Sequence, residues 1–202
     1  MTPLSALLLG FALGLRHATD ADHVAAIGTL LRREMSVRRA TRLAASWGMG
    51  HTVTFLALGL AIVGAGLHVT ERFERIAEAL VAAMLIGLGV SALRAQGRRL
   101  RAFEPWRPVA IGVVHGLGGS AGVALLAVTT IPSRGGAVAY LALFCAGTVV
   151  GMVALTILLS MPLGWTQRRF GGTPRLVVLA AAGLSVCLGL KLGARALAGL
   201  AP

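Results

Sequence analysis

The side chains best suited to chemistry are histidines and aspartates that interrupt hydrophobic sequence. Six of them stand within or between apolar runs: His17, Asp20, Asp22, His23, His51 and His115. An ionisable side chain in a membrane span costs about 2.5 kcal/mol or more, so such residues usually mark a functional site. Imidazole and carboxylate together suit Ni²⁺, Co²⁺, Zn²⁺ or Fe²⁺, and the lack of thiolate argues against Cu(I). These six residues are therefore the candidate metal ligands.

Helix geometry leaves the roles of the two aspartates open. At about 100° per residue, His17, Asp20 and His23 share one face of a continuous helix. Asp22 would then point elsewhere and support the site without binding the ion. A discontinuous helix would instead let all four side chains converge. Two other interpretations stay open, namely polar residues that hold helices together and a proton relay through the histidines.

Composition places these residues in a membrane. Of the 202 residues, 56% are hydrophobic and 13% are charged, whereas a soluble domain carries about 25% charged residues. The chain lacks the polar surface that a soluble enzyme needs. Each helical crossing of a bilayer takes about 20 apolar residues. We therefore expect an all-α, polytopic membrane helix bundle that forms a single transmembrane domain over residues 1–202.

Apolar runs predict about six transmembrane helices. They cover residues 4–31, with the polar interruption inside, and then 43–66, 76–93, 109–131, 137–161 and 176–197. Arginines concentrate in the loops after the first, third and fifth runs, and positively charged loops stay in the cytoplasm. The protein should therefore lie in the plasma (inner) membrane with both termini outside the cytoplasm. Trp47, Trp106 and Trp165 fall near the cytoplasmic ends of runs, where interfacial tryptophan is expected.

The two halves of the chain, roughly 1–100 and 101–202, resemble each other. The matching stretches are Gly14-Leu15-Arg16-His17 with Gly112-Val113-Val114-His115, and Leu88-Gly89-Val90 with Leu188-Gly189-Leu190. Three spans per half would place the halves in opposite orientations. A 3+3 inverted repeat with a broken helix in each half is typical of secondary transporters. The glycines that follow His115, at 116, 118 and 119, would let the fourth span unwind as the first does.

Two stretches carry a family resemblance. The first reads His17, four residues, then Asp22 and His23, and the second is Ser46-Trp47-Gly48-Met49-Gly50-His51-Thr52. With these motifs the chain resembles the nickel/cobalt transporter (NiCoT) superfamily. The larger members have eight helices and acidic residues in a later motif, which the corresponding stretch 114–122 lacks. The chain is therefore more similar to the small urease-accessory-type membrane proteins, which are thought to supply nickel to metalloenzymes.

Residues and resemblance together predict a secondary transporter for a divalent transition-metal ion, with Ni²⁺ or Co²⁺ uptake as the first expectation. His17, Asp22 and His23 would form the centre, and His51 and His115 would contribute from neighbouring helices. Asp20 would bind the ion or orient an imidazole through its second nitrogen. The ion is cargo, and we expect no tightly bound cofactor. A metal efflux carrier, or a membrane accessory subunit that delivers nickel to a metalloenzyme assembly pathway, stays open as an alternative.

The remaining features predict packing and partners. Gly118-x-Ser120-x-Gly122 fits a serine-hydrolase elbow, but no strand precedes it and we expect no enzyme. Cys145 and Cys187 should be small packing residues. Four GxxxG pairs should pack helices: Gly10/Gly14, Gly112/Gly116, Gly147/Gly151 and Gly189/Gly193.

The expected partners are the ion and the lipid bilayer, and a homo-oligomer or a metallochaperone stays open. The net charge of +12 lies mainly in short loops, so we expect no nucleic acid.

Overall fold

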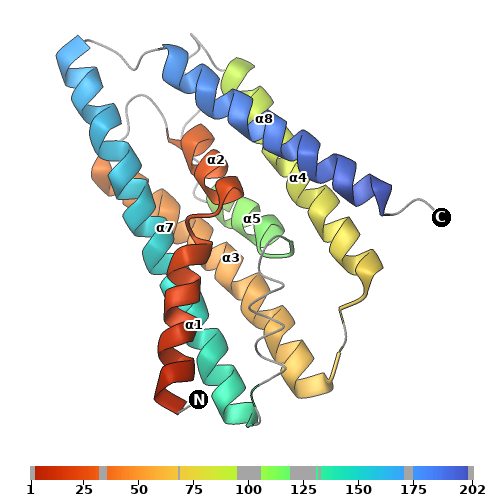
Figure 1. Ribbon diagram of the computed structural model, residues 1–202. Helices are drawn as coiled ribbons and strands as arrows, with labels where there is room; N and C mark the ends of the chain where they lie inside the picture. Colours follow the sequence, from red (N-terminus) through yellow and green to blue (C-terminus); the bar gives the residue numbers. More distant parts are fainter. Residues whose placement is uncertain are drawn as a thin grey trace.

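The computed structural model describes residues 3–31, 36–67, 69–94, 106–118, 131, 133–170 and 175–199, where all regular secondary structure is helical. The helices are α1 (Pro3–His17), α2 (Ala21–Leu30), α3 (Val37–Ala65), α4 (Glu71–Arg94), α5 (Trp106–His115), α7 (Arg134–Phe170) and α8 (Arg175–Ala198). The all-α class is confirmed. Figure 1 shows these helices as one elongated bundle.

The first crossing is broken where the sequence predicts it. α1 ends at His17, residues 18–20 form a turn and a bend, and α2 begins at Ala21. The hydroxyl of Thr19 donates to the carbonyl oxygen of Arg16 at 2.6 Å, which satisfies one acceptor at the end of α1. α5 ends at its own histidine in the same way, and the chain turns through 116–118. Each break releases the neighbouring backbone from regular helix geometry.

Four of the described helices are long and apolar enough to cross a membrane, namely Val37–Ala65, Glu71–Arg94, Arg134–Pro162 and Arg175–Ala198. The chain is therefore a multi-pass membrane protein. α7 continues past Pro162 to Phe170, beyond the predicted end at 161. Most of the second half of the predicted fourth span, 119–130, lies outside the described residues, so the count of six stays a prediction.

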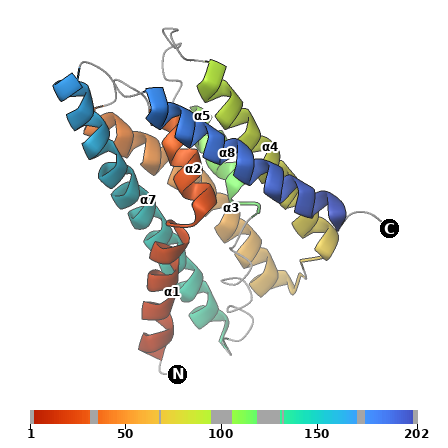
Figure 2. The same cartoon turned by 45° about the horizontal axis from the view of Figure 1, so that its top comes forward.

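The helices associate in two connected sets. α7 packs against both α1 and α3, α3 also packs against α5, and α4 packs against α8, while α2 lies against α8 and α4. Figures 1 and 2 show α1 and α7 running in one direction and α3 and α5 in the other, and α4 and α8 antiparallel at the side of the bundle. The metal-ligand candidates therefore come from helices that enter the centre from both ends.

Glycines allow the paired backbones to touch. A Cβ atom added at Gly14 would lie 2.8 Å from the backbone nitrogen of Thr148, and one at Gly112 would lie 2.8 Å from that of His51. A Cβ at Gly189 would lie 2.8 Å from a carbonyl oxygen of α4. Small residues at helix contacts are what close membrane packing requires, so the helix-packing role of these glycines is confirmed. Equivalent contacts in both halves agree with an inverted repeat, which itself stays a prediction.

Tryptophan placement corrects one prediction. Trp106 and Trp165 are 61% and 60% exposed, as interfacial residues should be, but Trp47 is 0% exposed. α3 begins at Val37, earlier than the predicted 43, so Trp47 lies inside the bundle instead of at its end. The interfacial interpretation of Trp47 is therefore wrong.

The two cysteines also differ from each other. Cys145 is buried, as a packing residue should be, whereas Cys187 is exposed on α8. The packing interpretation is therefore confirmed for Cys145 and wrong for Cys187 within the described chain.

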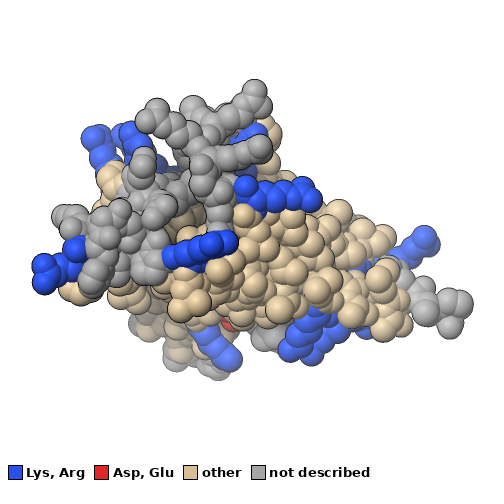
Figure 3. Space-filling view, turned by 90° about the horizontal axis from the view of Figure 1, so that it is seen from above, with Lys and Arg blue, Asp and Glu red and all other residues tan. Residues whose placement is uncertain are grey.

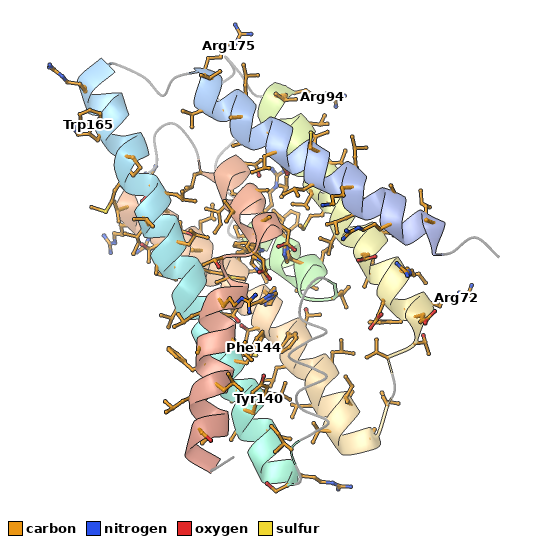
Figure 4. The ribbon with its side chains drawn as sticks, in the orientation of Figure 1. Arg72, Arg94, Tyr140, Phe144, Trp165 and Arg175 are labelled. Carbon is orange, nitrogen blue, oxygen red and sulfur yellow. The ribbon has the colours of Figure 1, made fainter. Side chains whose placement is uncertain are left out.

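Basic side chains gather at one end of the bundle. The described arginines there are Arg38, Arg39 and Arg42 on α3, Arg94 on α4, Arg107 on α5, Arg169 on α7 and Arg175 on α8. Figure 3 looks onto this end and shows Lys and Arg side chains standing out from a surface on which acidic side chains are scarcely visible. Figure 4 places Arg94 and Arg175 together at this end and Arg72 away from it. The charge asymmetry seen in the sequence is therefore a feature of the folded bundle.

Candidate metal centre

Four buried imidazoles meet at the centre of the bundle. His17 is the last residue of α1, His23 lies in α2, His51 in α3, and His115 is the last residue of α5. Their exposed fractions are 6%, 0%, 1% and 0%. Ring centroids are 4.6 Å apart for His17 and His23, and 4.3 Å apart for His23 and His115. The structure thus brings together histidines that are far apart in the sequence.

His17 and His51 face each other through their Nε2 atoms, which are 3.4 Å apart. The other nitrogen of His17, Nδ1, lies 3.0 Å from Oδ2 of Asp20. A neutral imidazole that donates from Nδ1 to this carboxylate would present the lone pair of Nε2 toward His51. Two nitrogens bound at about 2.1 Å to one tetrahedral ion stand about 3.4 Å apart. The observed spacing therefore fits a shared metal ion.

Asp22 connects the other two histidines. Its Oδ1 lies 3.2 Å from Nδ1 of His23 and accepts the backbone N–H of His23 at 3.0 Å. Its Oδ2 lies 3.3 Å from Nε2 of His115, without the alignment of a hydrogen bond. Since the helix breaks before residue 21, Asp22 reaches the cluster although a continuous helix would turn it away. The structure thus favours the converging arrangement of the four side chains.

Several polar atoms in the cluster lack a hydrogen-bond partner in the described part of the chain. They are Nε2 of His23, Nδ1 of His51, and Nδ1 and Nε2 of His115. A buried polar group without a partner costs about 1–3 kcal/mol, and helix-holding polar residues would be expected to satisfy one another. A cation bound by the imidazoles would supply the missing partners. The donor chemistry therefore fits a divalent first-row metal ion.

Five of the six candidates form two groups with metal-ligand spacing, and His23 belongs to both. One consists of His17, His23 and His51, and the other of Asp22, His23 and His115. Within each group the ligand atoms all lie within 4.8 Å of one another. Asp20 belongs to neither group and contacts Nδ1 of His17, as a residue that orients an imidazole does. Five of the six candidates thus lie at ligand spacing, and the sixth supports one of them.

Aromatic side chains line the cluster on opposite sides. Trp47, His51 and Phe55 follow one another at a spacing of four on α3, and each is at most 1% exposed. The Trp47 ring lies 5.4 Å from that of His23, and Phe144 of α7 lies 5.4 Å from His17 and 4.9 Å from Phe55. Figure 4 shows Phe144 and Tyr140 where α1, α3 and α7 meet. An apolar layer therefore closes the centre on either side of His51.

The sequence analysis missed Trp47, Phe55 and Phe144 as parts of the centre. Their only signal is a spacing of four residues from His51 or from Thr148, which apolar helices show for many residues. The hydroxyls of Thr148 and Thr156 donate to carbonyl oxygens of their own helix at 2.9 and 2.7 Å. The hydroxyl hydrogens of these two threonines are therefore satisfied by their own helix.

The cluster is least covered at the helix break. The side chains of Asp20 and Asp22 are 34% and 14% exposed, whereas the histidines are almost entirely buried. Carboxylates at the rim and imidazoles inside would attract a cation and then bind it.

Two predicted features, Gly119 and the serine of the elbow-like stretch, Ser120, lie outside the described residues.

Comparisons with known proteins agree with this chemistry. A family model described as high-affinity nickel-transport protein (NicO) matches residues 4–103. The protein named urease accessory protein UreH from Bacillus sp. (strain TB-90) is 31% identical over 184 residues, which are 82% of this chain and 81% of that protein. A high-affinity nickel transport protein of Cupriavidus necator is 36% identical over 72 residues, 35% of this chain and 20% of that protein. No solved structure matches the chain.

Proposed function

Because the chain belongs to the NicO family of high-affinity nickel-transport proteins, we propose that it carries Ni²⁺ or Co²⁺ across the membrane through its His/Asp cluster. The observation that carries the proposal is the convergence of four buried imidazoles and a carboxylate from α1, α2, α3 and α5. Ionisable groups at membrane depth are retained where they serve an ion pathway.

Each residue has a role in this proposal. His17, Asp22, His23, His51 and His115 bind the ion, and Asp20 holds the imidazole of His17 in the orientation that presents Nε2. Asp20 and Asp22 together carry two negative charges, which balance one divalent cation. Burying an unbalanced charge in a medium of low dielectric is costly, so the loaded site is more stable inside the membrane than a site of imidazoles alone. The ion is cargo, not a resident cofactor.

The basic end of the bundle sets the proposed orientation. Positively charged loops stay in the cytoplasm, so the ends of α4 and α7 and the start of α8 face the cytoplasm. The N-terminus and the end of α8 then face outward, and the protein lies in the plasma membrane. Uptake is the first proposed direction, and efflux through the same site is its alternative. Cellular nickel content on overexpression separates them, because uptake raises it and efflux lowers it.

The central experiment uses the purified full chain. Equilibrium dialysis measures binding of Ni²⁺ and Co²⁺, and proteoliposomes measure their uptake beside Zn²⁺ and Mg²⁺. His23→Ala should lower affinity by more than about tenfold, since changes outside the ligand set already cost that much. Thr156→Val is the matched control, because Thr156 is equally buried and its hydroxyl donates to a carbonyl oxygen of its own helix. Wild-type protein that neither binds nor transports these ions would refute the proposal.

The relative named a urease accessory protein favours a second candidate function. In that function the chain is a membrane accessory subunit that passes nickel to a metalloenzyme assembly pathway, with a metallochaperone or a second copy of the chain as partner. The purified chain would then bind nickel but would not transport it alone. Uptake into proteoliposomes by the chain alone therefore separates the two functions. Neither function requires catalysis by this protein.

A further inference from the structure

Two groups of ligands overlap at a single residue in the metal centre. His17, His23 and His51 form one group, and Asp22, His23 and His115 form the other. We infer that these groups are two successive positions for one ion, which keeps its bond to His23 while it moves from one to the other. This inference rests on the proposed function and specifies how the site would pass its cargo on.

The spacing of the ligand atoms argues against one position that uses all five side chains. Atoms bound to one ion at about 2.1 Å stand at most about 4.2 Å apart. Within each group of three, the ligand atoms lie within 4.8 Å of one another. The five side chains taken together do not form a single group with that spacing among the described residues. Small adjustments therefore complete either position, whereas a single five-ligand site needs a larger rearrangement.

The shared ligand permits only one ion at a time. Two divalent cations bound to neighbouring positions of a buried cluster would repel each other strongly where the effective dielectric is low. His23 is 0% exposed and belongs to both groups. The centroid of its ring lies 4.6 Å from that of His17 in one group and 4.3 Å from that of His115 in the other. Its imidazole can thus hold the ion while the other ligands exchange.

Ligand type gives the two positions different roles. One position includes the carboxylate of Asp22, and the other consists of three imidazoles and lies against Phe144 and Phe55. A carboxylate accepts many divalent cations, whereas three imidazoles favour first-row transition metals over Mg²⁺ and Ca²⁺. The position with Asp22 therefore captures a cation, and the three-histidine position selects for metal type.

The test uses Co²⁺, whose visible absorption reports its ligands, with purified full-length protein in detergent. His51→Gln removes one ligand of the three-histidine position, and His115→Gln removes one ligand of the position with Asp22. Each variant keeps a side chain of similar size, and thermal unfolding checks that the fold survives. Thr156→Val is again the control. Dialysis measures the number of Co²⁺ ions bound, and proteoliposomes measure transport.

Wild-type protein should bind one Co²⁺ per chain. His51→Gln and His115→Gln should each still bind one Co²⁺, with absorption spectra that differ from each other, and neither should transport. Because the association constant of the wild type is the sum of those of its two positions, at least one of the two variants should keep about half or more of the wild-type affinity. His23→Ala should weaken binding far more than either variant. Identical spectra for His51→Gln and His115→Gln, transport by either one, or two Co²⁺ per wild-type chain would overturn the two-position inference. Wild-type protein without Co²⁺ binding would instead refute the proposed function.

Discussion

Gly14 allows the metal centre and the packing of α1 to be tested together. It lies one turn before His17, and its Cα faces the backbone of α7 at Phe144 and Thr148. Gly14→Ala adds a single methyl group to this contact and changes no ligand. Any loss of metal binding would then come from displacement of α1, which carries His17 at its end.

The structure gives the size of this effect. The added Cβ would lie 2.8 Å from the nitrogen of Thr148 and closer still to the carbonyl oxygen of Phe144. An ordinary contact needs at least 3.4 Å, so the contact with the Thr148 nitrogen alone requires α1 to move by about 0.6 Å and the closer carbonyl oxygen requires more. Either displacement exceeds the tolerance of about 0.5 Å for a binding site. Overpacking of this kind costs about 1–3 kcal/mol in stability. Displacement of a site by about 1 Å can cost up to about a hundredfold, so affinity for Ni²⁺ should fall by about tenfold or more.

The assay combines thermal unfolding in detergent with equilibrium dialysis against Ni²⁺. Gly87→Ala is the control, because Gly87 lies within α4 with nothing within 4 Å of an added Cβ. That variant should match wild type in both measurements or unfold at a slightly higher temperature, since alanine favours helix more than glycine. Gly14→Ala protein that binds and unfolds like Gly87→Ala would show that close packing of α1 on α7 does not position His17.

Three further predictions concern separate parts of the molecule. Asp22→Asn should weaken Ni²⁺ binding more than Asp20→Asn in dialysis, because Asp22 contacts two histidines and Asp20 orients one; the reverse order would favour the continuous-helix assignment. Cysteine at Arg38 should be labelled only from the cytoplasmic side and cysteine at Glu74 only from outside, and labelling of both from one side would contradict the proposed orientation. Ser185→Ala removes a 2.8 Å hydrogen bond to the backbone of α4, which should cost about 0.6 kcal/mol, and up to about 1.7, in thermal unfolding.

The sequence predicted which ionisable side chains cluster at the candidate metal centre better than it predicted their arrangement. Ionisable residues in apolar runs stand out because membranes penalise them, so all four buried histidines could be found without a structure. The role of Asp22 could not, since it depends on the backbone path through residues 18–20. A projection onto a regular helix holds only where the helix continues, and no pattern in the sequence gives the angle between α1 and α2.

The enclosure of the centre could not be predicted for a different reason. Phe55 and Phe144 are two of many aromatic and aliphatic residues in apolar runs, and their contact joins α3 to α7. Periodicity identifies a face of a helix but not the helix that it meets. Trp47 was misassigned because the predicted start of its run was late. Boundaries are the least reliable part of such predictions, and an interfacial assignment depends on the boundary directly.

The scaffold around the centre is more regular than its ligands. Gly14 meets the backbone of α7 at Thr148, and Gly112 meets the backbone of α3 at His51, with the same 2.8 Å separation. Thr148 and His51 thus occupy equivalent positions, each opposite a glycine of the neighbouring helix. Of these two residues, only His51 directs a ring nitrogen toward His17. The Thr148 hydroxyl is satisfied by its own helix. Close backbone packing therefore requires the glycines in both pairs and leaves the facing side chain free to vary.

This difference has a consequence for transport. Transporters built from inverted repeats open a central site to either side of the membrane by rocking one repeat against the other, and α1 with α7 runs opposite to α3 with α5 here (Figures 1 and 2). The candidate ligands are not divided equally between these helices, because α1, α2 and α3 supply His17, Asp22, His23 and His51, while α5 supplies His115. Under the two-position inference, movement of α5 relative to the other helices would change the ligand set by one residue, His115.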